Sequence, residues 1–311
     1  MDKASCRVNG KRKSIANEHG SRRVETAIKA ARRFAYEVKG VADNEAEIIA
    51  AIGNFHGRSI NSISLSNDHD ATKNYGPFVP GIKKVEYGNV EAVRTAITSN
   101  TAAIIVEPIQ GEAGIIIPPA GYLKAIREIC TENNVLFIAD EVQTGFARTG
   151  KMFACEWENV VPDIYVMGKA LGGGVFPVSA IAANKDIMDV FTPGSHGSTF
   201  GGNPLACAVS LAAIEVIVQE NLVEKSLKLG EYFANALRTI KNPLLKEVRA
   251  RGLFIGVEFD KSVRDYCEQL MDEGVLCKET QVNTIRFAPP LVIKQTELDW
   301  ALERITKILS K

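Results

Sequence analysis

The sequence lacks an excess of charge of either sign, because Lys and Arg together number 37 and Asp and Glu also number 37. Bulk electrostatics therefore gives no reason to expect nucleic acid or an anionic membrane as a partner. No apolar run approaches the roughly 18 residues that a transmembrane helix needs, and no apolar segment follows the basic N-terminal residues as in a secretory signal. We therefore expect no membrane span, and partners that are small molecules or a second copy of the chain.

The six cysteines lack any CxxC spacing. In a chain of this length, that argues against both a disulfide framework and a zinc site. We expect reduced, mostly buried thiols in a cytoplasmic protein. No cluster of side chains predicts a metal site or a Ser/His/Asp arrangement. The cysteines are Cys6, Cys130, Cys155, Cys207, Cys267 and Cys277.

Hydrophobic residues make up 46% of the chain, which is enough for a core in one large or two smaller domains. Residues 24–221 alternate short apolar runs with helical patterns, which predicts βαβ units and a mostly parallel sheet with helices on both faces. Residues 222–311 mix strands with helices, which predicts a smaller C-terminal α+β domain. Residues 1–23 are polar and without period, and we expect them to be disordered. The expected strands are 47–52, 102–106, 135–139, 164–167, 178–182, 253–259 and 284–288. One helix is expected to begin at Val24, and the other expected helices are 91–97, 122–132, 204–218, 222–240 and 297–309.

Two charged residues stand at the ends of neighbouring predicted strands. Asp140 follows the run Val135–Ala139, and Lys169 follows Ile164–Met167 and one glycine. Ligands collect at the carboxyl ends of parallel strands, although such charges also simply mark where a strand leaves the core. Three glycines after Leu171 would let the backbone approach something bulky. A desolvated lysine there can form a Schiff base, and a nearby Asp could keep a pyridine nitrogen protonated.

Three motifs in one order carry a family resemblance. The runs DEVQTG from Asp140, GKALGGG from Gly168 and GSTFGGNP from Gly197 resemble the class III aminotransferases, and the likeness extends from Val24 to the C-terminus. Within that family, GSHGST from Gly194 and IRFAPPLVI from Ile285 are more similar to ornithine aminotransferases than to acetylornithine aminotransferases. The resemblance implies the type I fold of enzymes that use pyridoxal 5'-phosphate (PLP), and a homodimer.

The resemblance also implies a cofactor site. Lys169 would hold PLP as a Schiff base and then move the proton, and Asp140 would pair with the pyridine nitrogen. Gln143 would bond the ring hydroxyl. Phe55 would stack on the ring, unless it is simply a core aromatic. Thr199 would reach across the dimer interface to the phosphate of the partner's cofactor.

Substrate contacts are implied at three charged residues. Arg286 resembles the arginine that grips the α-carboxylate of a 2-oxo acid through its bidentate fork, although a charge at a strand start can also be superficial. Glu112 resembles a gate that covers Arg286 when ornithine binds, so that the δ-amine reacts, and opens for 2-oxoglutarate. Arg58 resembles a second carboxylate contact. We interpret His56 and His196 as positioning or packing residues.

The N-terminal segment departs from the family. Where relatives have a Thr-Gly-Ala or Ser-Gly-Ala phosphate loop at a helix N-terminus, this chain has His19-Gly20-Ser21-Arg22-Arg23. Synonymous codons for the family-like run ALPMNTGAE, read one base early, give SIANEHGSR, which is residues 14–22. We therefore expect a truncated or frameshifted N-terminus, the alternative being an unrelated basic tail.

The resulting expectation is δ-transamination of L-ornithine with 2-oxoglutarate, giving glutamate 5-semialdehyde and glutamate, within arginine and proline metabolism and amino-acid biosynthesis. Two alternatives stay open. One is an acetylornithine aminotransferase or another ω-aminotransferase. The other is a catalytically impaired remnant, because pocket residues would lie in the N-terminal portion and a misplaced substrate loses rate steeply.

Overall fold

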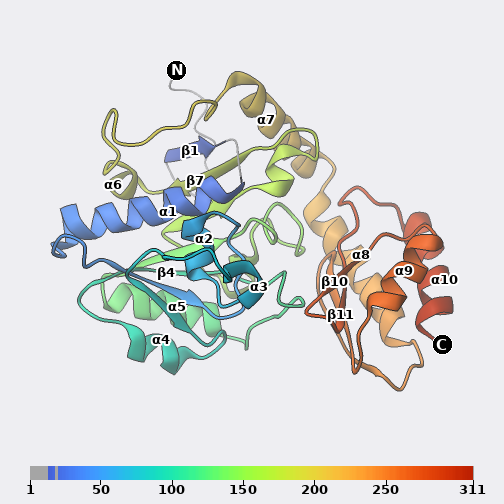
Figure 1. Ribbon diagram of the computed structural model, residues 1–311. Helices are drawn as coiled ribbons and strands as arrows, with labels where there is room; N and C mark the ends of the chain where they lie inside the picture. Colours follow the sequence, from blue (N-terminus) through green and yellow to red (C-terminus); the bar gives the residue numbers. More distant parts are fainter. Residues whose placement is uncertain (1–12, 18–19, 311) are drawn as a thin grey trace. The chain divides into compact units, whose positions relative to one another are not determined.

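The computed structural model describes residues 13–17 and 20–310 of the chain. The chain divides into two compact units (Figure 1). Unit 1 contains the chain up to Pro108 together with Pro118–Gln143 and Cys155–Ile214. Unit 2 contains Ile109–Ile117, Thr144–Ala154 and Glu215–Lys311. The second unit therefore contains two short segments from within the span expected for the first domain, and it begins at Glu215 where the expected boundary lay after residue 221.

Unit 1 is built on a seven-stranded sheet with the order β1-β7-β6-β5-β4-β2-β3. The pairs β2–β3, β2–β4, β4–β5 and β5–β6 are parallel, whereas β7 runs antiparallel to β6 and to β1. The parallel core confirms the predicted fold class. The carboxyl ends of β2, β4, β5 and β6 consequently lie at one edge of the sheet. The strands are β1 Lys13–Asn17, β2 Glu47–Ala51, β3 Ile82–Val85, β4 Thr101–Val106, β5 Leu136–Asp140, β6 Ile164–Met167 and β7 Ser179–Ala183.

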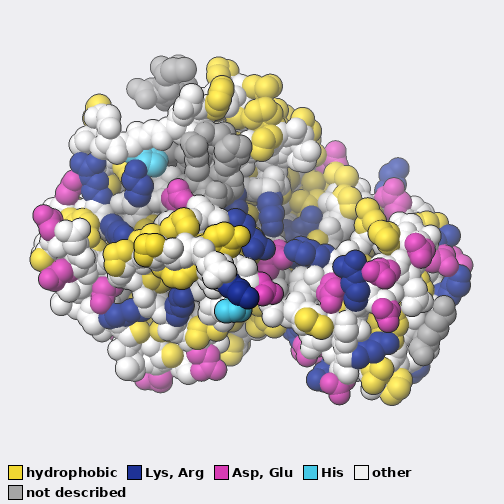
Figure 2. Space-filling view, viewed as in Figure 1, with side chains coloured by type: hydrophobic (Ala, Val, Ile, Leu, Met, Phe, Trp, Pro, Cys, Tyr) yellow, Lys and Arg dark blue, Asp and Glu magenta, His cyan; other side chains and the backbone are white. Residues whose placement is uncertain are grey.

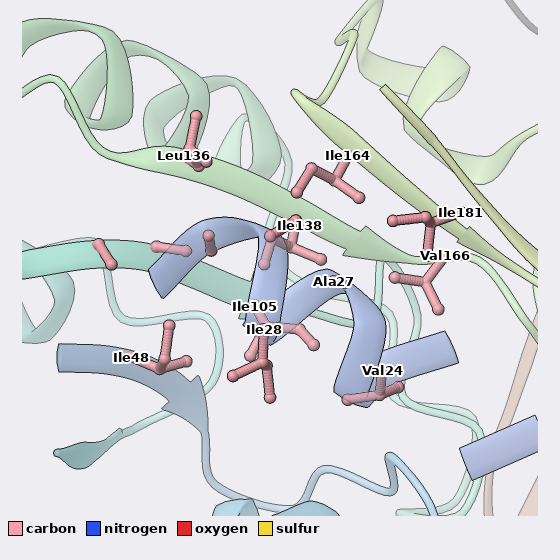
Figure 3. Close-up of a cluster of buried hydrophobic side chains, with 14 of the residues drawn as sticks. Val24, Ala27, Ile28, Ile48, Ile105, Leu136, Ile138, Ile164, Val166 and Ile181 are labelled. Atoms are coloured by element: carbon pink, nitrogen blue, oxygen red, sulfur yellow. The ribbon is translucent and has the colours of Figure 1, made fainter. Parts of the chain in front are cut away.

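Alternate residues of each central strand pack on opposite faces of the sheet, because successive side chains of a strand point to opposite sides. One face is covered by α1 (Gly20–Phe34), whose residues Val24, Ala27 and Ile28 meet the strand residues drawn in Figure 3. The other face is covered by α4 (Val90–Ala96) and α5 (Tyr122–Glu132). Burial on both faces explains why these strands are continuous apolar runs. Shorter helices are α2 Ile60–Leu65, α3 His69–Thr72 and α6 Lys185–Met188, and α7 Pro204–Gln219 follows.

Unit 2 is an antiparallel sheet of four strands with the order β10-β11-β9-β8. Its core joins the sheet to three helices, with Phe233, Val257, Ile285 and Leu302 among the buried members. This arrangement confirms the predicted α+β character. The elements are α8 Leu222–Arg238, β8 Leu245–Arg251, β9 Phe254–Phe259, α9 Arg264–Asp272, β10 Lys278–Thr280, β11 Thr284–Phe287 and α10 Gln295–Leu309.

The N-terminal part differs from the expectation. The helix expected from Val24 begins at Gly20, and Lys13–Asn17 form the edge strand β1, within the segment expected to be disordered. Residues 1–12, 18 and 19 lie outside the described chain. In the described part, no individual helix has the length and apolar content of a membrane span; only α7 and α8 counted together, with a bend of 63°, reach it.

Candidate active site

Asp140 ends β5 as a buried carboxylate with two hydrogen-bond partners. Its Oδ2 lies 2.7 Å from Nδ1 of His56, and its Oδ1 accepts from the Val142 N–H at 3.2 Å. His56 is also buried and comes from the loop that follows β2. The parallel order β2, β4, β5 places these two strand ends at the same edge of the sheet. His56, interpreted from the sequence as a positioning or packing residue, orients this carboxyl.

The environment keeps Asp140 ionised. Burial by itself would raise the pKa of Asp140, but the hydrogen bond and attraction from His56, the charge of Arg23 and the Val142 N–H together lower it. A carboxylate that stays charged inside the protein can balance a positive charge on a ligand. Nε2 of His56 is buried without a hydrogen-bond partner in the described chain.

Lys169 follows β6, the neighbour of β5, so the two predicted residues share one sheet edge. It begins a short 3-10 helix, Lys169–Gly172, and its side chain is exposed. Its φ of 45° is in the left-handed region, which non-glycine residues seldom occupy and which tends to mark functional sites. Gly173 and Gly174, which were expected to let the backbone approach something bulky, have φ values of 59° and 74°. Nothing lies within 4 Å of a Cβ placed on Gly174, so that glycine serves the left-handed turn.

Phe55 is held at the same edge by Glu107, the residue that follows β4. The Phe55 N–H donates to Oε1 of the buried Glu107 at 2.8 Å. The guanidinium carbon of Arg58 lies 5.4 Å from the centre of the Phe55 ring. Phe55 is half-buried, so it is not a closed core aromatic and stays partly accessible.

Gln143 and Thr199 are the two remaining residues expected at the cofactor. Gln143 is half-buried in the turn that follows Asp140. Thr199 is exposed in the loop between α6 and α7. The described chain alone contains no partner subunit, so the predicted reach of Thr199 across an interface stays a prediction.

Unit 2 contains the second predicted group, a cluster around Glu112. Oε1 of Glu112 lies 2.7 Å from Nη1 of Arg286, and Oε2 lies 2.6 Å from Nζ of Lys278. The Arg286 side chain is only 14% exposed, so it is not a superficial charge. Antiparallel pairing of β10 with β11 puts Lys278 directly opposite Arg286. One carboxylate therefore pairs with two neighbouring cations.

The backbone around Glu112 is fixed by two devices. A bridge between Gln110 and Ile116 closes the turn that carries Glu112, and Nη2 of Arg249 on β8 donates to the Gly114 carbonyl at 2.8 Å. Burial would raise the pKa of Glu112, but the hydrogen bonds from Lys278 and Arg286 and their charges lower it to about 2. At neutral pH the cluster therefore has two cations and one internal anion. If Glu112 moves away, an anionic ligand can take its place on Arg286.

Sequence reasoning did not single out Glu107 or Lys278, and it did not assign His56 to Asp140. Glu107 had the same signal as Asp140, a carboxylate directly after a buried strand. Lys278 had no signal, because its pairing with Arg286 depends on the register of β10 and β11. His56 was visible as a residue, but its partner lies 84 positions away.

The groups at the edge of unit 1 fit a PLP-type cofactor. The set contains a buried carboxylate for a pyridine nitrogen, a strand-end lysine for an aldehyde and an accessible aromatic ring for stacking. The orphaned His56 Nε2 leaves hydrogen-bonding capacity beside Asp140. In the described chain, no group of three or more His, Cys, Asp or Glu side chains could hold a metal ion.

Known proteins resemble the chain over almost its whole length. The sequence profile of a family described as Aminotransferase class-III matches residues 3–309, and so extends through the segment set apart as atypical. An ornithine aminotransferase of Oceanobacillus iheyensis is 72% identical over 308 residues, covering 99% of this chain and 77% of that protein. An ornithine aminotransferase structure from Toxoplasma gondii, with partial PLP occupancy at its active site, has a TM-score of 0.95 at 43% identity and covers 97% of this chain and 73% of that one. An acetylornithine aminotransferase from Elizabethkingia anophelis has a TM-score of 0.85 at 43% identity, covering 96% and 74%.

Proposed function

Because the chain belongs to the class III aminotransferase family, we propose that it binds PLP and transfers the δ-amino group of L-ornithine to 2-oxoglutarate. The products would be glutamate 5-semialdehyde and glutamate. The observation that carries the ornithine assignment is the ion pair between Glu112 and Arg286. Support for the cofactor comes from Asp140 and Lys169 at neighbouring strand ends.

PLP supplies an electron sink when it is bound. Asp140 would hold the pyridine nitrogen protonated, and Phe55 would stack on the ring. Gln143 would donate to the ring hydroxyl. Lys169 would hold the cofactor at its aldehyde end and would move the proton at the substrate carbon, because its amine lies at the strand end where the cofactor would sit.

The Glu112 cluster would decide which amine of ornithine reacts. With Glu112 on Arg286, no strong site remains there for the α-carboxylate of ornithine. With Glu112 displaced, Arg286 can hold the α-carboxylate of 2-oxoglutarate through two hydrogen bonds. Arg58 would contact a second carboxylate. Ornithine has one carboxylate and 2-oxoglutarate has two, which is the difference that such a gate can detect.

A homodimer would complete the site through Thr199 of the partner subunit. Apolar side chains gather over α7 on the face shown in Figure 2. Leu205 and Leu211 of α7 are 59% and 41% exposed, and Phe200 in the loop before it is 66% exposed. Clustered exposed apolar residues of this kind mark interaction surfaces. We expect the protein in the cytoplasm, where thiols stay reduced.

The cofactor is tested by treating the protein with PLP, reducing with borohydride and mapping the modified peptide. We expect the label on Lys169, and no label at that peptide in Lys169→Ala. Lys185→Ala, which removes an exposed lysine of α6, is the matched control and should label normally. Labelling at another lysine with Lys169 unmodified would refute the assignment.

The reaction is tested by incubating the protein with PLP, 2-oxoglutarate and one amino donor, and identifying products by mass. Ornithine should give glutamate 5-semialdehyde. N-acetylornithine is the second donor to compare, because the acetylornithine aminotransferase structure is also similar to this chain. Faster turnover of N-acetylornithine than of ornithine would favour that alternative.

A further inference from the structure

Arg23 lies in the first turn of α1, which faces the sheet, and its side chain is mostly buried. If a methyl carbon were placed on Gly168, it would lie 2.4 Å from Nη1 and 3.1 Å from the guanidinium carbon of Arg23. The guanidinium therefore packs directly against the residue that precedes Lys169. Its Nε is buried without a hydrogen-bond partner in the described chain. The guanidinium is therefore largely removed from water and keeps one buried N–H without a partner in the described chain.

The charged group that acts on this guanidinium is Asp140. The two groups attract each other: Arg23 lowers the pKa of Asp140, and Asp140 opposes the lowering of the Arg23 pKa by burial. Gly168 follows β6 and Asp140 ends β5, and these strands are neighbours. The cation therefore lies at the edge where the ends of β5 and β6 meet.

We propose that Arg23 is an internal counter-ion that competes with PLP for Asp140 and so weakens cofactor binding. This inference rests on the proposed function, since it takes Asp140 as the partner of a protonated pyridine nitrogen. A pyridinium and a guanidinium carry the same charge, and both are stabilised by the one carboxylate. Arg23 also occupies space against Gly168, beside the lysine that would bind the aldehyde. Cofactor entry therefore requires the Arg23 side chain to leave a place where it neutralises a buried anion.

An opposite role is possible for the same side chain, because an arginine can bind the cofactor's phosphate. The two roles predict opposite effects of removing the charge. A competitor lowers the affinity for the pyridine ring, whereas a phosphate ligand raises the affinity for PLP and leaves pyridoxal, which has no phosphate, unaffected. The contact with Gly168 and the attraction to Asp140 favour the competitor.

The test compares PLP dissociation constants, measured by absorbance or fluorescence titration, for the intact chain and Arg23→Ala. Alanine suits the first turn of a helix. We expect at least about tenfold tighter binding, equivalent to about 1.4 kcal/mol. Arg23→Met keeps the alkyl stem without the charge and covers the case in which the alanine variant folds poorly. Arg33→Ala, which removes an arginine paired with Glu37 near the end of the same helix, is the control and should bind as the intact chain does.

A double-mutant cycle with Asp140→Asn shows whether Arg23 changes the PLP affinity through Asp140 or through the fold as a whole. If Arg23 acts through Asp140, the gain from Arg23→Ala should largely disappear in the Asp140→Asn background. Without PLP, Arg23→Ala should melt at a lower temperature, because a buried carboxylate loses a counter-ion, yet PLP should raise its melting temperature by more.

Equal dissociation constants for the intact chain and both Arg23 variants would overturn the competitor role and leave the cofactor proposal standing. Weaker PLP binding by Arg23→Ala, with pyridoxal binding unchanged, would overturn it in favour of a phosphate ligand. If neither the intact chain nor a folded Arg23 variant takes up PLP, both this inference and the proposed cofactor fail.

Discussion

The strongest prediction concerns the selectivity of the Glu112–Arg286 pair. Replacing Glu112 by alanine leaves Arg286 without the carboxylate that lies 2.7 Å from it. The α-carboxylate of ornithine can then take the place of the Glu112 carboxylate on Arg286, which places the α-amine where transfer occurs. We expect the ratio of α- to δ-transfer from ornithine to rise in Glu112→Ala, while transfer to 2-oxoglutarate is retained.

The magnitude follows from the electrostatics of the cluster. The pKa of Glu112 is lowered from 4.5 to about 2, which corresponds to about 3 kcal/mol of stabilisation of its charged form. Two cations, Arg286 and Lys278, share that stabilisation. If about half comes from Arg286, the closed gate disfavours a competing carboxylate by about 1.5 kcal/mol, or roughly tenfold. The α-product should therefore increase about tenfold relative to the δ-product.

The assay is mass analysis of the products formed from ornithine, with the two possible oxo products resolved. Glu247→Ala is the matched control, because Glu247 also pairs with an arginine of unit 2, Arg249, at 2.7 Å but is 59% exposed. It should leave the product ratio unchanged. An unchanged ratio in Glu112→Ala as well, with normal PLP content, would refute the gate.

Three further predictions concern the same two clusters. Lys278→Met should shift the product ratio in the same direction as Glu112→Ala but by less, whereas Lys278→Arg, which keeps the positive charge, should leave the ratio as in the intact chain. The same product analysis measures both variants, and an unchanged ratio in Lys278→Met would remove Lys278 from the gate. The folded-state pKa of Glu112 is below its unfolded value, so its contribution to stability is complete above about pH 4.5 and is lost as pH falls toward about 2. Glu112→Gln should therefore flatten the pH dependence of the free energy of unfolding in this range, measured by denaturant unfolding. The same pH dependence in the variant and the intact chain would contradict the pairing. His56→Phe should remove the hydrogen bond to buried Asp140 and lower the free energy of unfolding by about 1–3 kcal/mol, measured by urea unfolding, whereas no change would mean that Asp140 finds another partner.

Local sequence signals predicted most of the sheet because burial on two faces demands it. The central strands of unit 1 are apolar over most of their length, and β5 and β6 begin and end within one residue of the expected bounds. The missed strands are β1, β3, β8 and β10. Strand β8 has the sequence LKEVRAR, in which only Val248 is buried, and it therefore carries almost no hydrophobic signal. Strand β10 has three residues and depends on its pairing with β11.

The N-terminal segment shows the limit of a reading from composition. Lys13–Asn17 has only Ile15 and Ala16 as apolar members, so it has no periodic pattern, yet it adds to the sheet as the partner of β7. Backbone hydrogen bonds to an existing strand can order a segment that no core requires. The start of α1 was placed four residues late for the same reason, since the polar first turn precedes the apolar face.

The sequence by itself determined the chemistry that is available and where on the chain it lies. Charged residues at the ends of buried strands pointed to Asp140 and Lys169, because a parallel sheet brings strand ends to one edge whatever the details of packing. Only the tertiary structure decided which side chains meet. The contacts of Asp140 with His56, of Glu112 with Lys278, and of Arg23 with Gly168 join residues 84, 166 and 145 positions apart. Such contacts depend on strand register, loop closure and rotamer packing, which act between distant parts of the chain and leave no local pattern in the sequence.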